Sequence, residues 1–227
     1  MNSIRASDIC AVVPCYNEER TIGEIVNTVR RHVEVCIVVD DCSTDRTAHL
    51  AAKCGARVLR HEKNLGKGMA LRNGFALAQA AGLRAAITLD GDGQHDPEEI
   101  PRFVKTFDGG KVDIVLGDRM GEQEKMPFVR RATNRFASWC ITRMAGVPIS
   151  DSQVGFRLIR LDTWQRLDLD GRRFDLESEV IIKACQRGAK IAQVPIRTIY
   201  NGTADSKINP LLDALRFFRV LWRCRKA

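Results

Sequence analysis

The sequence predicts an α/β fold in which a mostly parallel sheet is flanked by helices. In the first half of the chain, short apolar runs alternate with segments whose apolar residues recur at helical spacing. The 227 residues are enough to bury one large core. Polar clusters directly follow three of the apolar runs, as expected where ligands bind beyond the carboxyl ends of parallel strands.

The first two strand–helix units are the clearest. A strand is expected over residues 9–13, an apolar run that Pro14 ends, and a helix over residues 18–31, where apolar residues lie at helical spacing. A second strand over residues 35–39 leads through a polar turn into a helix that ends near Cys54. Right-handed crossovers between such units keep the strands parallel.

The alternation continues and then weakens. It predicts a strand over residues 56–59, a helix over about 67–81, and strands over 85–89 and 112–116. Beyond about Gly117, helices are expected near residues 129–144 and 176–186, joined by loops rich in glycine, serine and charge. This second half is expected to form the other wall of a cleft.

An acidic loop, Asp90-Gly91-Asp92-Gly93-Gln94, follows the fourth predicted strand. Residues two apart in an extended chain project to the same side, so the two carboxylates would lie together. Such a pair, beside glycines that allow close approach, suits a hard divalent cation that carries phosphate oxygens. Asp90, Asp92 and Gln94 are therefore the predicted metal ligands.

A calcium loop or a helix cap would also place acids here. An EF-hand requires glycine at position 6 and glutamate at position 12, and counting from Asp90 those positions hold His95 and Pro101, so this interpretation fails. Asp96 followed by Pro97 is typical of a helix start. We expect Asp96 to be a cap rather than a ligand.

Composition indicates an ordinary globular protein of the cytosol. Residues 1–7 are short and polar, unlike a secretion signal, and no apolar run approaches the roughly 18 residues of a membrane-spanning helix. The eight cysteines are scattered without a Cys-x-x-Cys pair, which favours a reducing compartment. The four histidines lack the spacing of zinc ligands.

Positive charge is concentrated at the C-terminus. The chain carries +8 overall, and residues 207–227 hold six basic residues against one acid, so their partner should be anionic. We expect one domain over residues 1–207 and a basic amphipathic helix over 208–227, packed on the domain or lying at a membrane surface. Its apolar stripe comprises Ile208, Leu211, Leu212, Leu215, Phe218 and Trp222.

Two common phosphate-binding signatures are not met. A Walker motif around Lys67 would need glycine at position 61 and a hydroxyl residue at position 68, where the chain has His61 and Gly68. The Gly-x-Gly-x-x-Gly fingerprint would need glycine at position 71, which is Leu71. Neither a P-loop enzyme nor a dinucleotide-binding dehydrogenase is indicated.

Six motifs together resemble the family 2 glycosyltransferases of the GT-A fold, in the dolichyl-phosphate mannosyltransferase-like branch. In order they are Val13 to Glu19, Val39 to Thr47, Asn64 to Gly74, Asp90 to His95, Gly117 to Arg119, and Asp151 to Arg157. Each motif alone is weak, but the set covers nearly the whole chain in the expected order.

The resemblance implies transfer of a sugar from a nucleoside-diphosphate donor, with inversion at the anomeric carbon. It implies nucleoside contacts from Pro14, Tyr16, Glu18 and Asp41, a Mg²⁺ or Mn²⁺ ion on Asp90, Asp92 and Gln94, and a phosphate contact from Arg119. Lys67 and Arg72 lie beside glycines at the ligand edge of the sheet. They are either solvated helix charges or contacts to the negative charge of the donor.

The acceptor is either a polyprenyl (dolichyl) phosphate or a hydroxyl group. A lipid phosphate is already an anion and needs cations, for which Arg119, Arg131 and Lys207 are the candidates. A hydroxyl must lose a proton, a step in which a carboxylate base contributes roughly 10²–10⁴-fold, and Asp151 would be that base. The segment around Asp151 looks more like the lipid-phosphate branch. The catalytic candidates are Asp92, Asp151 and Arg119.

The predicted function is therefore metal-dependent transfer of a hexose from a donor of the GDP-mannose or UDP-glucose type to a polyprenyl phosphate. The protein is expected at the cytoplasmic face of a membrane, bound peripherally or through an integral-membrane partner. A different class of function is a non-catalytic module that binds nucleotide sugars or nucleic acid. Nucleic acid is disfavoured because aromatic residues are only 6% of the chain and the predicted site is acidic.

Overall fold

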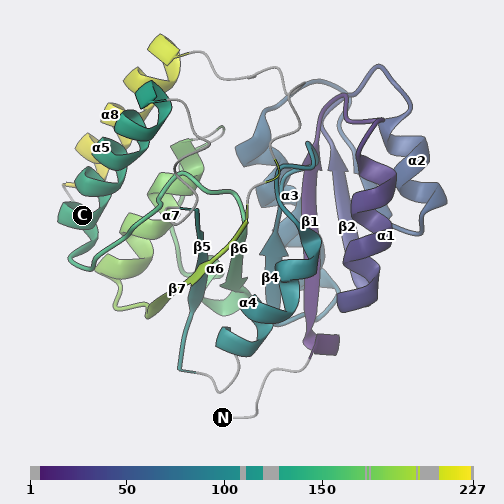
Figure 1. Ribbon diagram of the computed structural model, residues 1–227, viewed down its shortest axis with the longest axis horizontal. Coiled ribbons are helices and arrows are strands. Elements are labelled where there is room, and N and C mark those ends of the chain that lie inside the picture. Colours follow the sequence, from purple (N-terminus) through teal and green to yellow (C-terminus); the bar gives the residue numbers. More distant parts are fainter. Residues whose placement is uncertain are drawn as a thin grey trace.

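The computed structural model describes residues 6–107, 111–119, 128–171, 173, 175–197, 199 and 210–225. At its centre is a seven-stranded sheet with the strand order β3-β2-β1-β4-β6-β5-β7 (Figure 1). The strands are β1 (Ile9–Cys15), β2 (Val35–Asp40), β3 (Arg57–Arg60), β4 (Ala85–Thr88), β5 (Ile114–Asp118), β6 (Arg157–Arg160) and β7 (Ile191–Pro195). The predicted α/β architecture is confirmed.

Strand β6 runs against the direction of the rest of the sheet. Strands β1 to β4 pair in parallel, and β5 pairs in parallel with β7. Strand β6 is inserted between β4 and β5 and is antiparallel to both. The sequence did not predict β6 or β7. Strand β6 is only four residues long and has an arginine at each end, so it lacks the long apolar run of a buried parallel strand.

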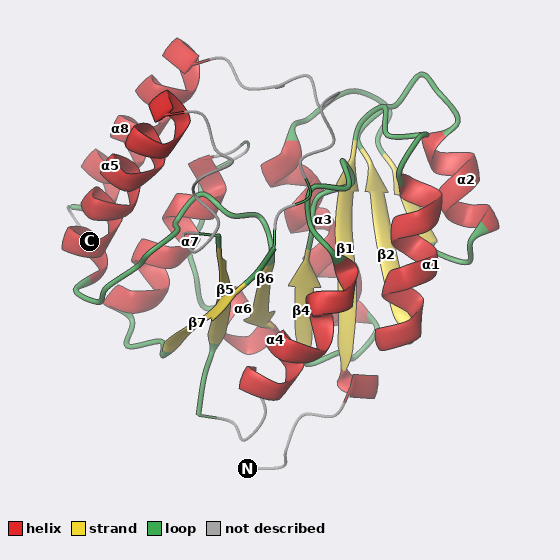
Figure 2. Cartoon of the chain, in the orientation of Figure 1, coloured by secondary structure: helices red, strands yellow, loops and turns green. Residues whose placement is uncertain are grey.

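Helices cover both faces of the sheet (Figure 2). They are α1 (Ile22–His32), α2 (Thr47–Lys53), α3 (Lys67–Ala80), α4 (Ile100–Phe107), α5 (Phe128–Ala145), α6 (Leu161–Gln165), α7 (Asp175–Gln186) and α8 (Pro210–Cys224), with short 3₁₀ turns at Ala6–Asp8 and Pro97–Glu99. Side chains alternate along β1, so Ala11 and Val13 pack with α1 and α4, and Val12 packs with α3. Two apolar layers result, one on each face.

A glycine brings α3 close to the sheet. A Cβ atom on Gly74 would lie 2.4 Å from Cγ1 of Val12, far inside van der Waals contact. Helix α3 therefore packs directly on β1, and this fixes the position of its first residue, Lys67, at the end of the sheet.

Of two predicted helix starts, one lies where the sequence places it and the other is shifted. Oδ1 of Asp96 accepts a hydrogen bond from the Glu98 amide at 3.0 Å, with Pro97 at the first helical position, so the predicted cap is confirmed. Helix α1 begins at Ile22, later than the predicted residue 18. Residues 18–21 instead form a turn in which the carbonyl oxygen of Glu18 accepts from the amides of Thr21 and Ile22.

Helix α8 packs on α7 and α5, and the described side chains of the predicted stripe are mostly exposed. Val220 and Cys224 are fully buried, and Phe217 and Leu221 pack against the same core. Leu215, Phe218 and Trp222 of the predicted stripe are each more than half exposed. Ile208 lies outside the described residues, as do the side chains of Leu211 and Leu212.

Two further expectations concern cysteines and membrane spans. All eight cysteines are free thiols. Within the described ranges, no helix has the length and apolar character needed to cross a bilayer.

Candidate active site

The polar motifs converge at one edge of the sheet. The segments after β1, β2, β4 and β5 all leave from the carboxyl ends of parallel strands (Figure 2). Because β6 is antiparallel, the segment that precedes it, residues 151–156, lies at the same edge: Arg157 pairs in register with Thr88 of β4 and Leu116 of β5. The reversed strand therefore brings Asp151 and Gly155 to the site.

The acidic loop is held by a lysine that also contacts a second carboxylate. Nζ of Lys67 lies 2.6 Å from Oδ1 of Asp90 and 3.0 Å from Oε1 of Glu177, at the start of α7. A Cβ atom on Gly155 would lie 2.8 Å from Asp90 Oδ2 and 2.9 Å from Lys67 Nζ. Only glycine at position 155 leaves room for this ion pair.

The ion pair shifts the pKa of both partners. Burial raises the pKa of Asp90, but the positive charge of Lys67 outweighs burial and lowers this pKa to about 2. Burial lowers the pKa of Lys67, and the two carboxylates outweigh it, so the lysine pKa is raised above its ordinary value. Both groups are charged at neutral pH.

The rest of the acidic loop is shaped by main-chain hydrogen bonds. The Asp90 amide donates to Nδ1 of His95 at 3.1 Å, and Oδ1 of Asp92 accepts from the Gln94 amide at 2.9 Å. Burial lowers the pKa of His95, consistent with a neutral ring that accepts at Nδ1. Gly93 adopts a φ of 74°, in the left-handed region that favours glycine. These hydrogen bonds and the glycine conformation together define the shape of the loop.

The donor atoms of this loop fit a hard divalent cation. Asp90, Asp92 and Gln94 offer carboxylate and amide oxygens, which Mg²⁺ and Mn²⁺ prefer. In the described part of the chain, no group of three or more His, Cys, Asp or Glu side chains is placed to hold a metal by itself. Such a loop matches Mg²⁺ sites in which one or two carboxylates bind the ion and substrate phosphates complete the shell.

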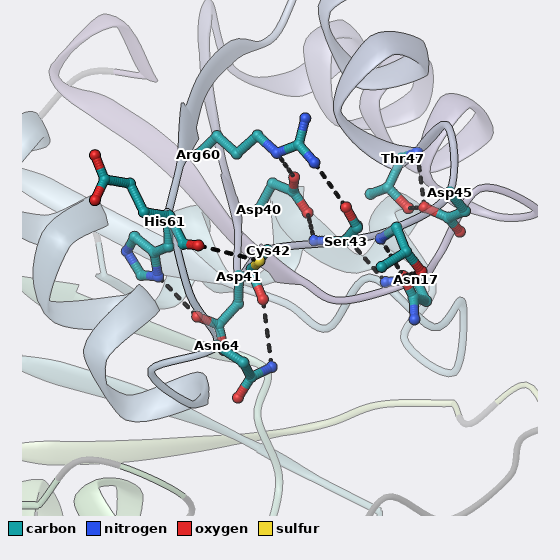
Figure 3. Close-up of polar contacts among 12 residues, drawn as sticks. Asn17, Asp40, Asp41, Cys42, Ser43, Asp45, Thr47, Arg60, His61 and Asn64 are labelled. Carbon is teal, nitrogen blue, oxygen red and sulfur yellow. Dashed lines mark hydrogen bonds and ion pairs between the residues drawn. The ribbon is translucent and has the colours of Figure 1, made fainter.

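Asp41, directly after β2, organises the loop that leads into α3. Its Oδ1 accepts from the Leu65 amide at 2.8 Å and lies 2.7 Å from Nδ1 of His61, and its Oδ2 accepts from the Gly66 amide at 2.7 Å. Asn64 donates to the Asp41 carbonyl oxygen at 3.3 Å (Figure 3). Through this loop, Asp41 fixes the chain directly before Lys67.

The turn after Asp41 is also fixed by polar contacts. Oδ1 of Asp40 accepts from the Ser43 amide at 3.1 Å, and its Oδ2 lies 3.2 Å from Nε of Arg60 (Figure 3). Cys42, which directly precedes Ser43, has a φ of 67°, a value that an L-residue rarely adopts. Asn17, after β1, accepts from the Thr44 amide at 2.9 Å and so links the first two motifs.

Arg119 and Asp151 form a buried ion pair with two hydrogen bonds. Nε of Arg119 lies 2.6 Å from Oδ2 of Asp151, and Nη2 lies 3.0 Å from Oδ1. Oδ1 also accepts from the Gln153 amide at 3.1 Å. Asp151 is fully buried and Arg119 nearly so. The carboxylate predicted as a base is therefore fully engaged with the arginine predicted to bind phosphate.

The other predicted site residues that the structure describes lie on or shortly after β1, on α3 and on α5. Pro14 is in β1, and Tyr16 and Glu18 follow it, with the Glu18 amide donating to Oγ1 of Thr47 at 2.8 Å. Arg72 donates to the carbonyl oxygens of Leu169 and Gly171, which anchors the segment before α7. Arg131 is half-buried on α5. Lys207 lies outside the described residues.

Sequence reasoning missed two residues of the site, Glu177 and Gly155. Glu177 lies 110 positions from Lys67, on a helix whose other acids have structural contacts, so no local pattern marks it. Gly155 is one glycine among seventeen. Its position beneath Asp90 and Lys67 depends on the antiparallel β6.

Comparison with known proteins gives consistent matches. The family model described as "Glycosyl transferase family 2" matches residues 10–166. An uncharacterized protein of Methanocaldococcus jannaschii is 37% identical, with 98% of this chain and 93% of that protein aligned. The UDP-N-acetylglucosamine–dolichyl-phosphate N-acetylglucosaminyltransferase of Methanococcus voltae is 28% identical (94% of each chain), and the dolichyl-phosphate hexose transferase of Haloferax volcanii is 31% identical (92% of this chain, 90% of the relative).

A solved structure has the same fold. Glucosyl-3-phosphoglycerate synthase of Mycobacterium tuberculosis superimposes with a TM-score of 0.72 at 22% identity, covering 95% of this chain and 80% of that one. That enzyme has also been solved with Mn²⁺, uridine diphosphate and phosphoglyceric acid.

Proposed function

Because this chain belongs to glycosyl transferase family 2 and is a glycosyltransferase, we propose that it moves a hexose from a nucleoside-diphosphate sugar to a polyprenyl phosphate. The main support for the proposal is the ion pair between Lys67 and Asp90 of the acidic loop. It lies at the edge of the sheet where the other motifs converge. The reaction would be metal-dependent and would invert the anomeric carbon. Relatives that act on dolichyl phosphate by name support the acceptor class.

The donor would bind across the carboxyl ends of β1, β2 and β4. Pro14, Tyr16, Glu18 and Asp41 would line the nucleoside side, and Lys67 and Arg72 are proposed on the side of the diphosphate. Asp90, Asp92 and Gln94 would hold Mg²⁺ or Mn²⁺. A metal ion held there would stabilise negative charge on the leaving diphosphate, an effect that would lower the barrier by several kcal/mol.

The contacts of Asp151 favour an anionic acceptor over a hydroxyl. A general base needs a carboxylate that can reach and accept a proton. Both oxygens of Asp151 are within hydrogen-bond distance of Arg119, and the side chain is fully buried. A lipid phosphate needs no base, so an engaged Asp151 is compatible with it. We propose that Asp151 orients Arg119, and that Arg119, Arg131 and Lys207 serve the acceptor phosphate.

The outer surface of α5 and α8 supports peripheral membrane association. We call it the helical surface, and it consists of Phe136, Trp139, Leu215, Phe218 and Trp222, each at least half exposed. Both helices pack on α7, and they run side by side along one flank of the molecule (Figure 1). Phe136 and Trp139 stack with ring centroids 6.2 Å apart, and Leu215, Phe218 and Trp222 recur at helical spacing.

The charge of these helices fits an anionic lipid surface. Helices α5 and α8 contain seven arginines and one acid. Aromatic side chains favour the membrane interface, and each basic residue near an anionic surface contributes about 1 kcal/mol. An enzyme that takes a polyprenyl phosphate must reach the lipid layer, and this surface offers a means of contact.

The test is transfer assayed with defined acceptors. The purified protein is incubated with a panel of radiolabelled GDP- and UDP-sugars, Mg²⁺ or Mn²⁺, and a polyprenyl phosphate. The expected product is label in an organic-extractable lipid that mild acid releases. Label found only in a water-soluble glycoside would support the hydroxyl acceptor, and nucleotide-sugar binding without turnover would support a non-catalytic module.

A further inference from the structure

Lys67 bridges two carboxylates that lie far apart in the sequence. Its ammonium is 2.6 Å from Asp90 on the acidic loop and 3.0 Å from Glu177 on α7. The side chains of Lys67 and Glu177 are only 16% and 11% exposed, so the pair is largely shielded from water. At such distances and with little solvent, the contacts are stronger than those of a surface ion pair.

A divalent cation and this ammonium compete for the same carboxylate. A cation bound to Asp90 would repel Lys67, and an ammonium displaced into a largely buried site without a counter-charge carries a large free-energy cost. Glu177 already lies within ion-pair distance of Nζ. Glu177 can therefore remain paired with the ammonium when Asp90 binds a cation.

The position of Glu177 is fixed independently of Lys67. The buried side chain of Arg157 donates from Nη1 to the Glu177 carbonyl oxygen at 2.6 Å and from Nη2 to the Ser152 carbonyl oxygen at 2.9 Å. On the next turn of α7, Glu179 accepts from the amides of Asp170 and Gly171. These contacts hold the first turn of α7 in place, and so they keep the Glu177 carboxylate next to Lys67.

We infer that Glu177 is a positioning residue that retains the Lys67 ammonium beside the acidic loop when a metal ion occupies Asp90. Lys67 then stays close to the donor diphosphate without blocking the metal. This inference rests on the proposed function for the identity of the donor. Its main readout is metal binding by the protein alone, which requires neither donor nor acceptor.

The experiment compares Glu177→Gln with a matched control, Glu98→Gln. Gln has nearly the same shape as Glu but lacks the charge, and Glu98 forms an exposed ion pair with Arg31 and His32 away from the site. Mn²⁺ binding to the nucleotide-free protein is measured by electron paramagnetic resonance, and the melting temperature is recorded for each variant. We expect Glu177→Gln to weaken Mn²⁺ binding roughly 10- to 100-fold and Glu98→Gln to leave it unchanged.

A second pair of variants separates positioning from simple charge loss. If Glu177 acts through Lys67, then Glu177→Gln in a Lys67→Met background should weaken Mn²⁺ binding only a few-fold, from the remaining electrostatic effect. An equal loss in both backgrounds overturns the inference. So does an unchanged Mn²⁺ affinity in Glu177→Gln accompanied by a lower melting temperature, because that result indicates a structural role only.

Gly155→Ala provides a test that alters no charge. The added methyl group would lie 2.8–2.9 Å from the Asp90 carboxylate and from Nζ of Lys67, and so would displace the ion pair. If Glu177 acts through this ion pair, Glu177→Gln should have little further effect on Mn²⁺ binding in the Gly155→Ala background, even if Lys67→Met does not fold, and an undiminished effect there would count against the inference. If Mn²⁺ binding changes as expected but the protein transfers no sugar to a lipid, the proposed function is refuted and this inference still holds.

Discussion

Arg119 and Asp151 are joined by two hydrogen bonds in the protein interior, 2.6 Å from Nε to Oδ2 and 3.0 Å from Nη2 to Oδ1. Arg119 follows β5, and Asp151 precedes the antiparallel β6. The pair therefore ties together two segments on the proposed acceptor side of the site. A planar guanidinium held at two points has a fixed orientation, which a single contact would not impose.

Asp151→Ala should destabilise the protein by about 3–5 kcal/mol, because it leaves the Arg119 guanidinium buried without its counter-charge. Urea unfolding measures this difference. Arg119→Met combined with Asp151→Leu should recover much of the loss, since no charge then remains buried. If Asp151 were instead a catalytic base, Asp151→Asn would abolish turnover while the free energy of unfolding stayed close to that of the wild type.

Asp92→Ala should lower the transfer rate by roughly 10³-fold, which corresponds to several kcal/mol of barrier. The melting temperature should change little, because Asp92 is only partly buried and its side chain shapes a short loop. Initial rates at saturating Mn²⁺ and donor provide the measurement. Full activity in Asp92→Ala would mean that the acidic loop does not hold a catalytic metal.

Cys42→Gly should stabilise the protein by about 1 kcal/mol. Cys42 adopts a φ of 67°, where an L-side chain is strained and glycine is not. Its Sγ makes a weak hydrogen bond to the Glu62 carbonyl oxygen at 3.5 Å. Cys42→Ala is the control, because it removes the thiol but keeps the strain. Equal stabilities of the two variants would argue against this explanation.

Stability should fall in acid partly because of Asp45. Burial raises the pKa of Asp45, but hydrogen bonds from Thr47 and from the Glu19 amide together outweigh it and lower the pKa. A carboxyl group with a lowered folded-state pKa stabilises the protein above its unfolded value of about 4 and loses this effect as pH falls through the folded value. Asp45→Asn should therefore show a shallower loss of melting temperature below about pH 4. An unchanged slope would contradict this assignment.

Phe218→Ser combined with Trp222→Ser should reduce binding to anionic vesicles, by roughly tenfold for each aromatic side chain that enters the lipid interface. Sedimentation with vesicles that contain phosphatidylglycerol measures the bound fraction. The control is Leu77→Ser, which alters an exposed apolar residue on α3, away from the helical surface. Equal losses in both variants would mean that α8 has no special role in membrane contact.

The first half of the fold could be predicted from the sequence because its signals are local. The run from Ile9 to Val13 is apolar and ends at a proline, and the acidic loop directly follows the buried β4. Asp96 and Pro97 identified a helix start to the residue. In these places the spacing of neighbouring residues is enough to indicate the structure.

The second half could not be predicted in the same way because its contacts span long distances in the chain. Strand β6 is defined by its pairing with β4 and β5 rather than by its own composition. Glu177 meets Lys67 only in the folded protein. Apolar residues cover so much of α8 that two different stripes satisfy helical spacing, and the structure buries the one that contains Val220 and Cys224.

The insertion of β6 between β4 and β5 has a consequence for biosynthesis. Until the ribosome has produced residue 160, the outer side of β4 has no neighbour, although β1 to β4 can already associate. An unpaired, apolar strand edge promotes intermolecular association, so the nascent N-terminal portion should need protection by chaperones during this interval. Fragments that stop before residue 157 should consequently aggregate, whereas those that include the reversed strand should remain in solution.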